Sequence, residues 1–412
     1  MKPGSFYTLV YFFIIGTSIC SIAQTNIALS GKVFDASTRE PLGFASISIA
    51  GKPAGTVTNA VGEFDFNLPE QYSHDTLVIS HIGYKSFRKN IADLSRGSLS
   101  IGLNTNPLLL NEVVIREEKL TGKEIVAEAV KNLTINYSTQ PYCLKGFFRE
   151  IEQENEKYVV LTEAAVDVYD KNFDGKSQQS LQEAVAVREM RRSLHYGSRK
   201  NKDNIGIALT DLLENNDVRY NRGMLRMSNT FSMDTITTYH DRLVYGISIM
   251  NETDSGMLYI DTESYGILKI IMERRSRTKG NRYYQVITRK GNHIGRVWFR
   301  FTVEFEPYEN KLYLRRTHES ELNEIYDKAT GQVKISSMET LEFVTHNIVL
   351  NEEDKNAEQL KYGMNIKTGD YHPDFWKNYN SLKLTPLDEK LLGDLEKETT
   401  LKEQFENQNK IK

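Results

Sequence analysis

The sequence predicts a mainly β protein, in which an N-terminal seven-stranded β-sandwich precedes a larger antiparallel β domain, a curved sheet or half-barrel with a few helices. The first supporting observation is spacing, because short apolar runs alternate with Gly, Pro and Asn turns about every 8 to 12 residues. The second is composition, because 22 Tyr and 18 Phe against 9 Pro favour an aromatic-rich β protein over a disordered chain. A length of 412 residues indicates two or three domains.

The charge balance argues against a nucleic-acid partner. The formal net charge is −3 and the isoelectric point is near 6.3, whereas nucleic-acid binding usually needs a basic face. Hydrophobic residues make up 39% of the chain, which is enough for ordinary globular cores. The sequence lacks a Gly-rich phosphate loop and a G-x-S-x-G nucleophile motif, so we expect no cofactor and no enzyme activity.

Residues 1–23 read as a cleavable signal peptide. Lys2 supplies a short positive region, and 6–19 form an apolar stretch that is short for a membrane span of about 20 residues. Small residues at Ser21 and Ala23 predict cleavage between Ala23 and Gln24. The alternative is an uncleaved N-terminal membrane anchor. After residue 23 the sequence has no run of 18 apolar residues, so no transmembrane helix is expected.

The two cysteines give no disulfide framework. Cys20 leaves with the signal, and the bulky Ile19 before it argues against lipid modification. Cys143 is then alone, which excludes an intramolecular disulfide in the mature chain. Its apolar neighbours favour a small core residue, with a catalytic nucleophile as the alternative.

The segment 24–116 is expected to form the sandwich. Its predicted strands are 29–34, 44–49, 63–66, 76–81, 84–91, 99–103 and 113–115. Gly55, Gly62 and Gly83 stand at strand junctions, where a positive φ or a close backbone approach is expected. Residues 59–62 have the composition of a hairpin turn.

These residues carry a resemblance to a known family. Gly31-x-Val33-x-Asp35, then 40–42, 45–47, 55–59, 62–64, 77–80 and 82–84 occur in the order typical of the carboxypeptidase-regulatory-like domain, a transthyretin-like β-sandwich. The ending at 110–115 resembles the version of this domain that precedes the plug of SusC-type TonB-dependent transporters. The resemblance implies a non-catalytic accessory module in an exported or outer-membrane protein. Nothing after it resembles a carboxypeptidase, a plug or a transporter barrel.

The segment 117–380 is predicted to be the β-rich second domain. Charged residues 116–119 read as a linker, and Thr121 and Glu124 have capping-box spacing ahead of a helix that ends near Asn136. Residues 181–196 fit a helix or a strand, and 205–214 fit a short helix. The predicted strands are 143–152, 158–169, 242–251, 256–261, 266–272, 281–290, 295–306, 311–319 and 333–345. This pattern is similar in style to the half-barrel of periplasmic lipoprotein carriers, which is an analogy of fold alone.

The segment 381–412 is expected to be a C-terminal helix, beginning at Pro386, with a polar tail. The aromatic stretch 370–379 precedes it. Asp370, His372 and Asp374 lie two residues apart, so an extended backbone would place them on one face as metal ligands. The alternative is a polar turn around Pro373, and no metal site is predicted.

Two further groups of residues are candidates for binding. Five aromatic residues are candidates to line an apolar ligand pocket inside the curved sheet, namely Tyr283, Tyr284, Trp298, Phe299 and Phe301. Adjacent strand residues point to opposite faces, so only some of the five can line one pocket. The second group is a basic cluster that comprises Arg188, Arg191, Arg192, Arg199, Lys200 and Lys202. It could contact lipid head groups or an acidic partner. The alternative is a solvated face with acidic residues nearby.

Three hypotheses of function follow. The first is a non-enzymatic protein of the cell envelope, in the periplasm or associated with the outer membrane, whose sandwich docks and whose larger domain binds an apolar or polymeric ligand or a protein partner. The second is an envelope hydrolase using Asp370, His372 and Asp374. The third is a structural component of an outer-membrane assembly, which would show an exposed apolar patch.

Overall fold

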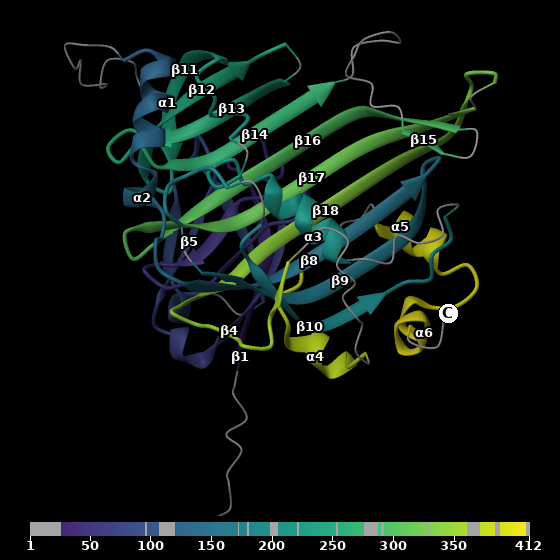
Figure 1. Ribbon diagram of the computed structural model, residues 1–412. Coiled ribbons are helices and arrows are strands. Elements are labelled where there is room, and N and C mark those ends of the chain that lie inside the picture. The colour runs from purple at the N-terminus through teal and green to yellow at the C-terminus, as the bar shows by residue number, and fades with distance from the viewer. Residues whose placement is uncertain are drawn as a thin grey trace, which may run out of the picture.

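The computed structural model describes residues 26–94, 97–106, 120–171, 173–178, 181–197, 205–220, 222–252, 254–275, 287–289, 292–327, 329–360, 371–383 and 388–408. The chain is mainly β, with a small N-terminal sandwich and a large open antiparallel sheet (Figure 1), which confirms the predicted fold class. The signal region, the cleavage pair Ala23 and Gln24, and the linker 116–119 lie outside the described residues.

Across the described part of the N-terminal segment, seven strands form two facing sheets. One sheet has the order β4-β1-β7, with β1 (Asn26–Asp35), β4 (Glu63–Pro69) and β7 (Ser98–Leu103). The other has the order β3-β2-β5-β6, with β2 (Ser46–Ile49), β3 (Gly55–Val57), β5 (Thr76–Ser80) and β6 (Phe87–Asn90). The short 3-10 helices η1 (Glu70–Tyr72) and η2 (Ile91–Asp93) follow β4 and β6.

Local chemistry explains most of this sandwich. The alternation in β4 buries Phe64, Phe66 and Leu68 in the core between the sheets. Gly62 and Gly83 have φ of +79° and +85°, as their turn positions predicted. Gly55 lies inside a strand that was not predicted, and the predicted strand 113–115 falls outside the described residues.

The large sheet has the order β11-β12-β13-β14-β16-β17-β18-β8-β9-β10-β19, and β15 pairs with β16. Its strands are β8 (Tyr142–Glu154), β9 (Lys157–Asp170), β10 (Ala184–Arg192), β11 (Thr230–Tyr239), β12 (Arg242–Met250), β13 (Asp254–Asp261), β14 (Ile267–Arg275), β15 (Ile287–Arg289), β16 (Asn292–Tyr308), β17 (Lys311–Asp327), β18 (Val333–Leu350) and β19 (Glu358–Gln359). The ambiguous segment 181–196 thus contains a strand. Long strands and repeated β-bulges give the sheet its twist and curvature.

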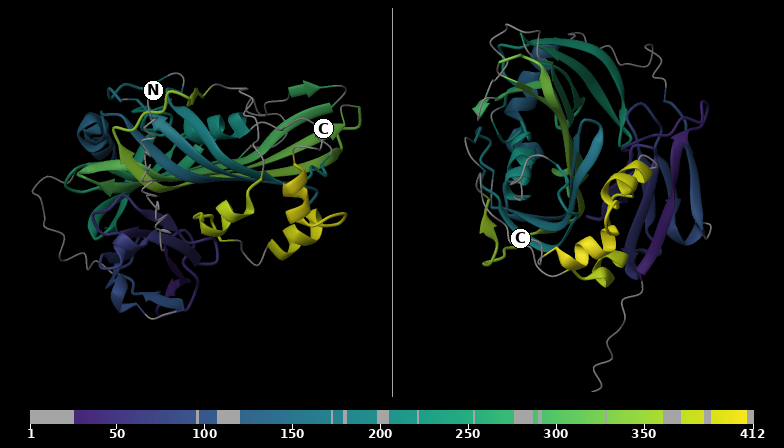
Figure 2. Two further views of the ribbon diagram at one scale, coloured as in Figure 1. Left: turned by 90° about the horizontal axis from the view of Figure 1, so that it is seen from below. Right: turned by 90° about the vertical axis from the view of Figure 1, so that its right-hand side faces the viewer.

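Helices cover the concave face of this sheet. They are α1 (Gly122–Lys131), α2 (Leu133–Asn136) and α3 (Ile205–Glu214). The predicted capping box is present. The Thr121 hydroxyl oxygen accepts a hydrogen bond from the Glu124 backbone N–H, and the Glu124 carboxylate accepts one from the Thr121 backbone N–H. The sheet curves around α3 (Figure 2), whose Leu209, Leu212 and Leu213 are buried in the main apolar core. Side chains of α3 therefore fill much of the half-barrel.

The sandwich and the C-terminal helices lie on the opposite, convex face (Figure 2). These helices are α4 (Pro373–Asn378), α5 (Asp388–Leu395) and α6 (Leu401–Asn407). The single C-terminal helix that we predicted is wrong, because the chain leaves α5 at Leu395 and Thr400 caps a new helix through Glu403. Among the described residues, no helix is both long and apolar enough to span a membrane.

Buried charges join the sandwich to the large sheet. Ser46 of β2 donates to Glu306 of β16 at 2.8 Å, and the Arg316 guanidinium lies 3.9 Å from the centre of the Phe44 ring. In the β16–β17 ladder, Glu304 pairs with Arg316 and Phe305 with Leu314, which leaves Arg315 in a bulge. This bulge lets two consecutive arginines face the sandwich.

Candidate ligand-binding site

A cavity of about 690 Å³ opens beside the C-terminal end of α3. Its walls come from the residues after α3, the β12–β13 turn, and strands β14 and β16. This volume lies within the range of about 300 to 1,000 Å³ that small-molecule sites occupy.

The floor of the cavity is apolar. Met224, Met272, Phe299 and Phe301 line it, and each is at most 7% exposed. The rings of Phe299 and Phe301 meet edge to face, with centroids 6.0 Å apart. All four side chains belong to the core that includes the α3 leucines, so the floor continues the main core of the large domain.

Arginines stand at the rim of the cavity. Arg274 donates two hydrogen bonds to Asp254, at 2.5 and 3.0 Å. Arg296 lies over the Phe299 ring at 4.8 Å and forms an ion pair with Glu321 at 2.6 Å. The side chains of Arg274 and Arg296 are 41% and 44% exposed, so water screens their charge.

Carboxyl groups lie deeper than the arginines. Asp217 is 6% exposed, accepts a hydrogen bond from the Met224 backbone, and has a pKa that burial raises to about 6. Behind the cavity, Glu319 is also 6% exposed, and burial raises its pKa to about 8 despite a hydrogen bond from Asn215. Asn215 itself lines the cavity and therefore connects Glu319 to its wall.

The structure separates the five predicted aromatic residues. Phe299 and Phe301 line the cavity, whereas Trp298 interacts with Glu273 and does not line it. Strand alternation accounts for this division. Tyr283 and Tyr284 lie outside the described residues.

Sequence reasoning missed the polar part of the site. Asp217 and Asn215 come from an irregular segment that only the tertiary fold brings to β16. The alternation of Met272 and Arg274 along β14 was the available signal, because both point toward the cavity.

His372 and Asp374 lie away from this cavity, on the convex side. The His372 ring meets Glu189 at 2.9 Å, and Asp374 accepts from Lys377 at 2.6 Å. Asp370 lies outside the described residues. Within the described ranges, no group of three His, Cys, Asp or Glu side chains has a metal-binding arrangement.

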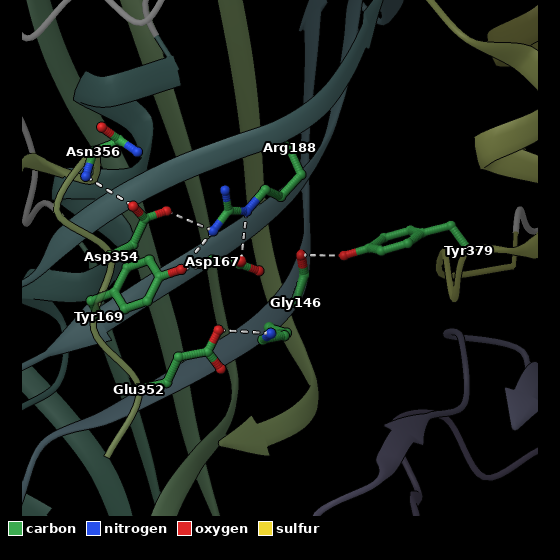
Figure 3. A network of polar contacts seen from close by, with 9 residues as sticks. Gly146, Asp167, Tyr169, Arg188, Glu352, Asp354, Asn356 and Tyr379 are labelled. Carbon is green, nitrogen blue, oxygen red and sulfur yellow. Dashed lines mark hydrogen bonds and ion pairs between the residues drawn. The ribbon is translucent and has the colours of Figure 1, made fainter. Parts of the chain in front are cut away.

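Two described members of the basic cluster, Arg188 and Arg191, belong to ion-pair networks. Arg188 of β10 donates to Asp167 at 2.7 Å and Asp354 at 3.0 Å (Figure 3). Arg191 donates to Glu163 at 2.6 Å, and Arg192 is half-buried on the same strand. The remaining members, Arg199, Lys200 and Lys202, lie outside the described residues.

Cys143 lies under this network and is fully buried. Burial raises the pKa of its thiol to about 12, so the sulfur stays protonated at neutral pH. A protonated, inaccessible thiol is a poor nucleophile.

The fold and the cavity define a β-sandwich joined to an open sheet that holds a ligand-sized space. The sandwich itself is a carboxypeptidase-regulatory-like domain, because residues 29–115 match the model of the CarboxypepD_reg-like domain. This match confirms the resemblance found in the sequence. No curated protein matches the chain in sequence.

Three solved structures are similar to parts of the chain. A DUF1329 family protein from Desulfovibrio piger has a TM-score of 0.25 and 10% identity, covering 58% of this chain and 96% of that one. A putative outer membrane lipoprotein-sorting protein domain from Vibrio parahaemolyticus has a TM-score of 0.27 and 11% identity, with 57% and 94% coverage. Lipovitellin has a TM-score of 0.28 and 7% identity, with 54% and 27% coverage. TM-scores this low support no conclusion about this chain.

Proposed function

We propose that the protein is a non-enzymatic ligand-binding protein of the cell envelope, whose large domain holds an amphiphilic small molecule in the cavity beside α3. The main support for this proposal is a cavity of about 690 Å³ with an apolar floor and charged walls. Such a combination suits a ligand with one apolar and one charged part, because each part then meets surface of its own kind.

The envelope location rests on the sequence. A signal peptide ending at Ala23 directs export, and the regulatory-like domain at 29–115 is the accessory module that its family places in exported proteins. The sandwich then serves as the docking module, in the periplasm or at the outer membrane. A mature protein whose mass begins at Gln24 is the expected product of export.

The hydrolase alternative has less support. Its described residues His372 and Asp374 face separate partners, Glu189 and Lys377. An acid, a base and a nucleophile must instead converge within hydrogen-bond reach of one substrate.

The test is the binding of a neutral apolar fluorophore, N-phenyl-1-naphthylamine, to the mature protein. Gly223 lines the cavity, and a Cβ added there meets its nearest atom, an Asp217 oxygen, at 3.9 Å, so the backbone accepts a side chain and the indole of Gly223→Trp would occupy the space. We expect saturable fluorescence enhancement in the wild type and at least about tenfold weaker binding in Gly223→Trp.

Gly393→Trp is the matched control, because Gly393 lies on α5 with open space around it, on the convex side. It should bind as the wild type does. Equal binding by both variants, or no binding by the wild type, would refute the cavity as the ligand site. Chemical turnover of bound esters or amides would favour the hydrolase.

A further inference from the structure

We infer that the cavity selects amphiphiles whose charged part is an organic ammonium group, and we expect it to discriminate against anionic head groups. This inference rests on the proposed function and specifies its ligand. Two observations support it: the arginines of the cavity are more exposed than its buried carboxyl group, and aromatic rings form part of the floor.

Three arginines with accessible side chains line the cavity, namely Arg226, Arg274 and Arg296, and the last two are paired with carboxylates. Arg274 directs both of its donors at Asp254, and Arg296 is held between Glu321 and the Phe299 ring. An anionic head group would have to displace one of these carboxylates. The rim is therefore a poor anion site, although it contains arginines.

Negative charge is buried. Asp217 and Glu321 are 6% and 9% exposed, and Glu319 lies beside Glu321 on the same face of β17. The acids that line the cavity are Glu214, Asp217, Glu252 and Asp254, against three arginines. A buried charge such as that of Asp217 is screened less than the charge of an exposed arginine. An ammonium ion entering the cavity gains more than it would from exposed acids.

The two buried acids have charged neighbours of both signs. Asp217 faces Arg226 and Asp254, and Glu319 faces Glu321, Asp211 and Arg296. Both acids have raised pKa values, because burial disfavours their charged forms. A bound cation would supply positive charge and lower both pKa values.

The aromatic floor adds a second attraction. Phe301 lines the cavity edge to face with Phe299, and Arg296 already covers one side of the Phe299 ring. Ring faces attract ammonium groups, and aromatic surfaces are a general means of recognising quaternary ammonium ligands. The alkyl part of the ligand would cover Met224 and Met272, which gives both parts of the molecule a partner.

The experiment compares three ten-carbon probes by isothermal titration below their micelle concentrations. They are decyltrimethylammonium, decanesulfonate and the neutral decyl maltoside. At pH 8.5 we expect the ammonium probe to bind at least about tenfold more tightly than the sulfonate. At pH 5 this preference should shrink severalfold, because Asp217 and Glu319 become protonated.

Variants identify the groups responsible. Asp217→Asn and Glu319→Gln should each weaken binding of the ammonium probe at pH 8.5 by about fivefold and leave decyl maltoside unchanged. Asp374→Asn, on exposed α4, is the matched control and should bind all probes as the wild type does. Because Asp217 also accepts from the Met224 backbone, Glu319→Gln and the pH series decide the matter if Asp217→Asn does not fold.

The outcomes separate the two claims. Failure of all three probes to bind would overturn the proposed function. Binding of decyl maltoside together with equal or tighter binding of the sulfonate would overturn the ammonium inference alone. Unchanged ammonium binding in Glu319→Gln would also overturn it.

Discussion

Glu319 is a buried acid, and its ionisation should measurably lower the free energy of unfolding. Its folded pKa of about 8 lies above the usual 4.5, so stability that is present below pH 4.5 is lost as the pH rises through 8. Glu319→Gln removes this loss. We expect it to raise the free energy of unfolding at pH 9 by about 1–3 kcal/mol and to change little at pH 4.5.

Urea unfolding at the two pH values tests this prediction, with the exposed Glu398→Gln as the control. The prediction would be contradicted if the difference in unfolding free energy between Glu319→Gln and the wild type were the same at pH 4.5 and pH 9.

Gly55 is a position where the sandwich and the sheet nearly touch. An added Cβ would lie 2.7 Å from the Arg315 guanidinium, which is itself held by Thr345 and Glu306 in a buried setting. Gly55→Ala must displace this arginine, so we expect a loss of about 1–3 kcal/mol in unfolding free energy. Gly393→Ala, in the interior of α5 with nothing nearby, should instead gain up to about 1 kcal/mol. Urea denaturation measures the unfolding free energy of both variants. An unchanged unfolding free energy in Gly55→Ala would refute the close contact between Gly55 and Arg315.

At the scale of single residues, the sequence predicted what alternation and turn chemistry determine. It placed Gly62 at a positive φ, and its alternation rule separates Trp298 from Phe299. It could not reveal Asp217, because burial of an acid depends on strands 50 or more residues away in the chain.

The C-terminal α4 segment connects the sandwich to the sheet. Trp376 packs with Phe147, Val344 and Val57, and these residues come from both parts of the molecule. Trp376→Ala removes that contact, and we expect a loss of about 3–4 kcal/mol in unfolding free energy. Lys377→Ala is the control, because its ion pair with Asp374 is exposed and worth little. Chemical denaturation should show the difference, and equal stability of the two variants would refute the role of α4.

At the scale of elements, local signals predicted well and distant pairings did not. The capping box located α1, and the short helix predicted at 205–214 is α3. Strand order was not predictable, because β18 pairs with β8 across almost 200 residues of sequence. The spacing of Thr400 and Glu403 is also that of a capping box, and it marks the point where the predicted single C-terminal helix is divided into α5 and α6.

At the scale of the molecule, two histidines make the contact between sandwich and sheet sensitive to acid: His346 is buried, and the side chain of His318 is 22% exposed. His346 meets the Gly55 carbonyl, and His318 lies near Arg316, Glu342, Arg300 and Glu304. Burial lowers their pKa values to about 3 and about 4, so below pH 6.5 the unfolded chain takes up protons that the folded protein does not.

Stability should therefore fall as the pH drops from 6.5 toward 4, by on the order of 1 kcal/mol per pH unit for each histidine. Glu304, Glu306 and Glu342 have pKa values lowered by neighbouring cations, so their contribution is lost at still lower pH. Urea midpoints between pH 7.5 and 4 measure this slope. His318→Gln should flatten it, whereas exposed His74→Gln should not. A flat wild-type profile would contradict the prediction.

The most direct test asks whether the cavity beside α3 holds an amphiphile. A crystal grown with 12-bromododecyl-trimethylammonium tests it directly, because anomalous scattering locates the bromine at the end of the alkyl chain. We expect a bromine peak against Met272, with the ammonium group beside Asp217. A fully ordered cavity that lacks the ligand, with bromine peaks elsewhere on the surface, would contradict it.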